Sequence, residues 1–112
     1  MDQAMSPMTT LFRALADATR IRLLALVREQ PQCVEDLAHA LAIRQPKASR
    51  HLAYLRRAGL VKRERNGRRI FYAFRTPTEG FARKVVADLL GHIDSAAFVR
   101  TDRRRLAGSR RP

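Results

Sequence analysis

Residues 45–74, QPKASRHLAYLRRAGLVKRERNGRRIFYAF, decide the fold of this chain. The first part of the stretch has apolar residues at helical spacing and a proline where the first turn of a helix would lie. Its apolar stripe consists of Ala48, Leu52 and Leu55. Gly59 predicts the end of this helix, because glycine readily takes the left-handed backbone of a C-terminal cap residue.

The second part of the stretch predicts a β-hairpin. After Gly59 the apolar residues alternate, as they do in a strand with one buried face. Asn66-Gly67 stands between two such runs, and both residues tolerate the positive φ that a type I′ turn needs. We therefore expect two strands, over residues 61–65 and 68–74.

Apolar spacing predicts three helices before this stretch. The first begins near Ser6-Pro7, a good cap and first-turn pair. The second has Asp17 as its candidate N-cap and ends before Pro31. The third is short and amphipathic, over residues 33–42. Its proximity to the helix of residues 45–58 predicts two helices joined by a tight turn.

One more helix is expected after the hairpin, opening at Pro77-Thr78. The apolar residues of its stripe are Phe81, Val85, Leu89, Ile93 and Ala96. The whole pattern predicts a mostly α, α+β fold of the winged helix-turn-helix class, with four helices, a β-hairpin wing and a C-terminal helix. In that fold the second helix of the helix-turn-helix enters the major groove of DNA.

Length and composition limit the alternatives. A chain of 112 residues is enough for one domain. Its one cysteine excludes an intrachain disulfide and is typical of a reducing cytosol, so we expect a cytoplasmic protein. No apolar run is long enough to span a membrane, and no signal peptide is visible at the N-terminus.

The charge is concentrated in two segments. The chain has 23 Lys and Arg against 10 Asp and Glu, a net charge of +13. Residues 45–75 hold ten basic residues and one acid, hence +9, and residues 100–112 hold six arginines and one acid, hence +5. We therefore expect a winged-helix DNA-binding domain over residues 1–99 and a basic, Arg-rich tail over residues 100–112, with double-stranded DNA as the polyanionic partner.

The helix of residues 45–58 and the hairpin supply the candidate DNA contacts. The residues expected to read bases are Gln45, Lys47, Ser49 and Arg50. Arginine can reach guanine and glutamine can reach adenine in the major groove. The residues expected at phosphates or in the wing are Arg44, His51, Tyr54, Arg56, Arg57, Lys62, Arg63, Arg65, Asn66, Gly67, Arg68 and Arg69. These would provide affinity and salt dependence more than sequence choice.

Three stretches resemble the ArsR/SmtB family of bacterial winged-helix repressors. They are residues 11–20 (LFRALADATR), 45–52 (QPKASRHL) and 55–61 (LRRAGLV), and the likeness runs over residues 11–72, more than half of the chain. The resemblance implies a sequence-specific repressor that binds an inverted-repeat operator as a homodimer. It also implies that the first and last helices form the dimer interface.

The chain departs from the family at its sensing positions. Arsenic-sensing members have Cys-Val-Cys-Asp where this chain has Cys33-Val34-Glu35-Asp36, so one of two thiolate ligands is missing. A redox role for Cys33 would require a low pKa and an exposed thiol. Asp88 and His92, four residues apart on the last helix, are weak candidates for a metal site, although the family's ligand spacings are absent there.

Arg44 is a further departure, because the family usually has serine at this position. An arginine cannot accept a hydrogen bond from the free N–H groups of a helix start. It can instead contact a phosphate at the edge of the groove, while Gln45 or a water caps the helix.

Other functions differ from that of a DNA-binding repressor in the residues that each of them would need. No phosphate loop, serine elbow or metal-binding histidine pair is visible, so we expect neither an enzyme nor a resident cofactor. The alternatives to a DNA-binding repressor are a metal- or redox-responsive sensor of the same family, a winged-helix module for protein assembly, and an RNA-binding regulator. A protein-binding module would expose apolar residues on the recognition helix, and double-stranded RNA has too narrow a major groove for that helix. No residue pattern identifies an inducer.

Overall fold

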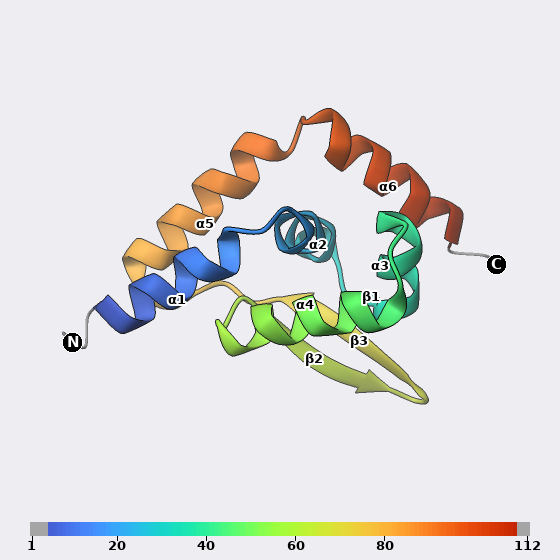
Figure 1. Cartoon of the computed structure of the whole chain (residues 1–112), viewed down its shortest axis with the longest axis horizontal. Coiled ribbons are helices and arrows are strands. Elements are labelled where there is room, and N and C mark those ends of the chain that lie inside the picture. The colour runs from blue at the N-terminus through green and yellow to red at the C-terminus, as the bar shows by residue number, and fades with distance from the viewer. Residues whose placement is uncertain (1–4, 110–112) are drawn as a thin grey trace.

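The computed structural model describes residues 5–109, which fold into six helices and one antiparallel sheet (Figure 1). The helices are α1 (Met5–Leu15), α2 (Ala18–Glu29), α3 (Val34–Leu41), α4 (Gln45–Arg57), α5 (Gly80–Ile93) and α6 (Ala97–Ser109). The strands are β1 (Gln32–Cys33), β2 (Val61–Asn66) and β3 (Arg69–Phe74), in the order β1-β3-β2.

Helix α2 lies at the centre, with the other helices around it and the sheet beneath (Figure 1). Five consecutive residues of α2, from Leu23 to Val27, are buried. The helix begins where predicted, since the side chain of Asp17 accepts a hydrogen bond from the amide of Arg20 at 3.0 Å. The middle of α2 is therefore buried on every side, and it is the scaffold on which the surface elements are placed.

The hairpin forms where predicted, but its turn is shifted by one residue. Asn66 pairs with Arg69 as the last pair of the ladder, so Gly67 and Arg68 are the loop residues. Among these residues only Gly67 has a positive φ, of 65°. A positive φ at the first loop position alone is the pattern of a type II′ turn, so the predicted type I′ turn at Asn66-Gly67 is wrong.

Strand β1 was not predicted from the sequence. Its two residues pair with β3, Gln32 opposite Tyr72 and Cys33 opposite Phe71. Two residues are too few to show an alternating pattern, and this strand exists only because β3 lies beside it. It fixes the start of α3 on the same sheet that carries the wing.

The C-terminal region differs from the prediction of a single last helix and a basic tail. Helix α5 ends at Ile93, and a separate helix, α6, crosses the predicted boundary between residues 99 and 100. Three residues of α6 are buried: Val99, Asp102 and Leu106. Their spacing is helical, and α6 packs on α2 and α3. The arginines around them hid this stripe, and residues 110–112 of the predicted tail lie outside the described residues.

Candidate nucleic-acid interface

A tight turn sets α4 against α3. Ala42 has a left-handed backbone, with φ 56° and ψ 44°, and the next amide, of Ile43, donates to the carbonyl of Ala38 at 3.0 Å. This pair of features ends α3 in the way a glycine would. Arg44 follows as the N-cap of α4 and makes no side-chain cap hydrogen bond, as expected for a residue without an acceptor.

The buried face of α4 is the predicted stripe. Ala48, Leu52 and Leu55 are fully buried in the core. The helix ends at its predicted glycine, because Gly59 has φ 79° and Leu60 donates to the carbonyl of Leu55 at 3.0 Å. With one face fixed in this way, the opposite face of α4 has a defined orientation toward solvent.

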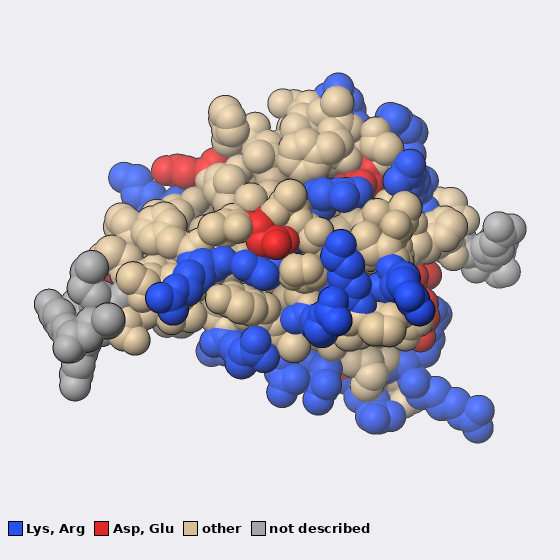
Figure 2. All heavy atoms as spheres, in the orientation of Figure 1, with Lys and Arg blue, Asp and Glu red and all other residues tan. Residues whose placement is uncertain are grey.

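The predicted base-reading residues occupy the first half of α4. Gln45, Lys47 and Arg50 are exposed, and Ser49 is half-buried. Most of the residues expected to contact phosphates are also exposed. They are Arg44 before α4, Arg56 and Arg57 at its end, and Lys62, Arg63, Arg65, Asn66, Gly67, Arg68 and Arg69 in the wing. Figure 2 shows Lys and Arg gathered over α4 and the wing, with other residue types over most of α5.

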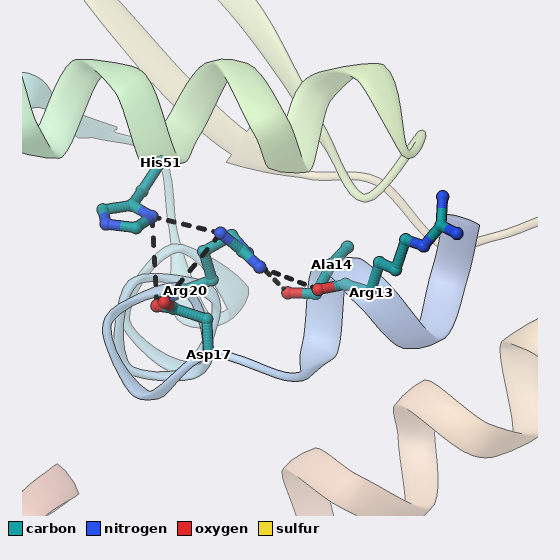
Figure 3. Close-up of polar contacts among 5 residues, drawn as sticks. All are labelled: Arg13, Ala14, Asp17, Arg20 and His51. Carbon is teal, nitrogen blue, oxygen red and sulfur yellow. Dashed lines mark hydrogen bonds and ion pairs between the residues drawn. The ribbon is translucent and has the colours of Figure 1, made fainter. Parts of the chain in front are cut away.

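The other two residues expected at phosphates, His51 and Tyr54, are half-buried, and both contact Arg20. Figure 3 shows the contact with His51. The Arg20 Nη1 atom lies 3.4 Å from His51 Nδ1, and the guanidinium carbon lies 4.1 Å from the centre of the Tyr54 ring. The prediction from sequence missed Arg20 because an arginine in an amphipathic helix usually marks a solvated face. The only available signal was the stretch LADATR, in which Asp17 and Arg20 fall on one side of the helix start.

The surroundings of His51 favour its neutral form. Burial lowers the pKa of His51, and the positive charges of Arg20, Lys47 and Arg50 act in the same direction, against the carboxylate of Asp17. For Asp17, burial raises the pKa, but the amide of Arg20 and the nearby charges outweigh it, so the net shift is downward. A neutral ring therefore lies beside an ionised carboxylate and a guanidinium at neutral pH.

Cys33 lies beneath the wing. Its side chain is fully buried, and Arg69 Nη2 donates to its Sγ atom at 3.0 Å. Burial raises the pKa of the Cys33 thiol, with the Arg69 guanidinium acting in the opposite direction. Both conditions for the redox hypothesis, an exposed thiol and a lowered pKa, are therefore unmet at Cys33 in this structure.

The two metal candidates on α5, Asp88 and His92, are both exposed. Among residues 5–109 the structure contains no group of three or more His, Cys, Asp or Glu placed to hold a metal ion. No helix within the same range is long and apolar enough to cross a membrane.

This chain is similar to known proteins in both sequence and fold. Residues 17–63 match the family described as "Bacterial regulatory protein, arsR family". The transcriptional repressor BigR from Xylella fastidiosa is 30% identical, with a TM-score of 0.61, over 76% of this chain and 84% of that one. The chain belongs to the ArsR/SmtB family.

Two further similarities extend this ArsR/SmtB assignment. The chain is 49% identical over 63 residues to the arsenic resistance transcriptional regulator ArsR1 of Pseudomonas putida, which is 55% of this chain and 49% of that protein. It has the fold of the homodimeric winged helix-turn-helix DNA-binding domain Mb0332 from Mycobacterium bovis, with a TM-score of 0.69 and 24% identity over 87% and 90% of the two chains. The chain spans about half to two thirds of the length of the curated relatives that it matches. Membership in a family of regulatory proteins agrees with the prediction that the chain is not an enzyme.

Proposed function

We propose that this protein is a sequence-specific, DNA-binding transcriptional repressor that acts as a homodimer on an inverted-repeat operator. The observation that carries the proposal is the junction of α4 and the wing. One exposed face of a helix with polar and basic residues lies beside a hairpin whose exposed side chains are mostly cationic, with Glu64 as the one acid among them. This is the arrangement that reads the major groove and holds the flanking backbone.

The residues divide by their position on this surface. Gln45, Lys47, Ser49 and Arg50 lie in the first half of α4, the part of a recognition helix that reaches base edges. We assign contacts with phosphates to the exposed cations at the end of α4 and along the wing. Arg68 is in the hairpin turn, where a side chain can enter a narrow minor groove.

An apolar surface on α1 and α5 supports the homodimer. Phe12 and Phe81 are 45% and 47% exposed, and their rings make an edge contact with centres 6.3 Å apart. Met8 is also exposed, and Val85 and Leu89 are only half-buried. Exposed apolar side chains gathered on two neighbouring helices are typical of a surface that a second copy covers.

The test begins by enriching duplexes that bind the protein from random-sequence DNA. We expect an inverted repeat with half-sites about one helical turn apart. Fluorescence anisotropy on the enriched duplex should show affinity falling on the order of a thousandfold between about 50 and 200 mM salt. Arg50→Ala should reduce the ratio of operator to random-sequence affinity, whereas Arg68→Ala should weaken both affinities together. A salt slope near zero, or an unchanged ratio in Arg50→Ala, would contradict the proposed reading surface.

A further inference from the structure

Arg20 joins three elements of the fold at one point (Figure 3). Its Nε atom donates to the carbonyl of Ala14 at 2.9 Å, and its Nη2 atom donates to the carbonyl of Arg13 at 2.7 Å. Both carbonyls belong to the last turn of α1. On its other side the guanidinium faces His51 and Tyr54 of α4. The side chain of Arg20 is only 13% exposed, so these contacts hold it inside the molecule.

We propose that Arg20 is a positioning residue that couples the orientation of the recognition helix α4 to the end of the dimerisation helix α1. This inference rests on the proposed function, since it concerns how a DNA-reading helix is held. The last carbonyls of a helix have no partner within the helix and carry partial negative charge. The carbonyl of Arg13 also accepts from the amide of Ala16 at 3.3 Å, just beyond the end of α1. A guanidinium is planar and always charged, so it can satisfy two such carbonyls and still present a flat face to an aromatic ring.

The contact with His51 defines the state of that ring. A hydrogen bond across this 3.4 Å contact requires the tautomer in which Nδ1 of His51 accepts and Nε2 carries the proton, because an arginine N–H is always a donor. The second ring nitrogen lies on the side of the ring away from Arg20 (Figure 3). An outward N–H on a neutral ring is suited to donate to a phosphate oxygen of DNA.

Asp17 completes the arrangement from the start of α2. Its Oδ2 atom lies 3.9 Å from Arg20 Nη1, and its Oδ1 atom lies 3.9 Å from His51 Nδ1. Asp17 also caps α2, so it fixes where Arg20 leaves the helix. A movement of α1 would displace the carbonyls that hold Arg20, and the displacement would reach α4 through His51 and Tyr54.

Three variants separate positioning from simple charge. Arg20→Lys keeps the charge but cannot bind two carbonyls and stack in one plane, and Arg20→Met removes every donor. Arg13→Ala is the matched control, because it removes a neighbouring exposed charge and leaves the carbonyl that Arg20 binds. Binding is measured by anisotropy on the enriched inverted-repeat duplex and on a scrambled duplex, with the salt dependence of each.

We expect both Arg20 variants to lose about tenfold to a hundredfold in affinity for the inverted repeat, the effect of misplacing one base-reading side chain. The salt slope should match that of the wild type, because the inferred role of Arg20 includes no contact with a phosphate. Arg13→Ala should keep the preference for the inverted repeat. Wild-type affinity in Arg20→Lys would overturn the inference, and so would a salt slope reduced by about one phosphate per protomer in Arg20→Met.

A spectroscopic measurement tests the inference without DNA. Nitrogen-15 chemical shifts of the His51 ring in the free wild-type protein should show a proton on Nε2 and none on Nδ1, and Arg20→Met should mix the two tautomers. A proton on Nδ1 in the wild type would overturn the inference even if the Arg20 variants do not fold. Failure of the wild-type protein to prefer the inverted repeat would count against the proposed function instead, and the ring shifts distinguish the two failures.

Discussion

The ion pair between Arg22 and Asp102 should anchor α6, and the two partners should contribute unequally. Arg22 donates to the two carboxylate oxygens of Asp102 from Nε at 2.9 Å and Nη2 at 2.8 Å. The Asp102 side chain is 2% exposed, whereas that of Arg22 is 28% exposed. If Asp102 is removed, the guanidinium can turn toward water. If Arg22 is removed, a buried carboxylate has lost its counter-ion.

We therefore expect Asp102→Ala to lower the free energy of unfolding by about 2–3 kcal/mol, and Arg22→Met to lower it by about 3–5 kcal/mol. At about 4 °C per kcal/mol for a chain of this size, the melting temperature should fall by about 8–12 °C in the first variant and by about 12–20 °C in the second. Arg104→Ala on the exposed side of α6 is the control, with an expected effect below about 0.5 kcal/mol.

The assay is thermal unfolding followed by circular dichroism at one fixed protein concentration, since dimerisation makes the melting temperature depend on concentration. Amide hydrogen exchange at Val99 and Leu106 shows whether α6 is released before the rest of the fold. The reasoning is refuted if Asp102→Ala has the same melting temperature as the Arg104→Ala control. It is also refuted if Arg22→Met lowers the melting temperature less than Asp102→Ala does.

Three smaller predictions concern the turn, the histidine and the cysteine. Ala42→Gly should raise stability by about 0.5–1 kcal/mol, because Ala42 holds a left-handed backbone at an exposed site; a lower melting temperature would contradict this. Because the pKa of His51 is lowered in the folded state, the folded protein binds a proton at this ring less well than the unfolded chain does. The free energy of unfolding should therefore be highest above about pH 6.5 and should decline as the pH falls from there through the folded pKa. Urea unfolding at several pH values should show this decline in the wild type and a smaller one in His51→Asn. Micromolar arsenite should leave DNA affinity unchanged and Cys33→Ser should still bind DNA, because one buried thiol cannot form a two-sulfur site; release from DNA with loss of one free thiol per chain would refute this.

The sequence predicted the elements whose side chains repeat. The stripe of α4 and the two strands of the hairpin were predictable because their own residues carry the period that burial requires. The family resemblance rested on part of this region together with residues 11–20, and it is confirmed. The candidate DNA contacts were placed on α4 and the wing for the same reason, and their roles remain predictions.

The features that sequence missed depend on a second element. Strand β1 has two residues and forms only beside β3. The loop moved to Gly67-Arg68 because Asn66 completes a pair with Arg69. Helix α6 was hidden because its buried stripe includes a charged residue, Asp102, whose partner is 80 positions away. Such long-range pairings have no local signature.

The wing has an open edge, and its charges also protect that edge. Within residues 5–109, strand β2 pairs only with β3, and every residue of β2 after Val61 is exposed. A long unpaired strand edge is a template for aggregation between copies, and cationic side chains along it discourage such pairing. Replacing Lys62, Arg63 or Arg65 with apolar residues would weaken DNA binding, but it would also leave an uncharged strand edge that promotes aggregation. Replacement by glutamate removes the attraction for phosphate but keeps a charge on the edge, so the copies still repel one another. Acidic substitutions are therefore better suited to testing the contribution of the wing to DNA binding.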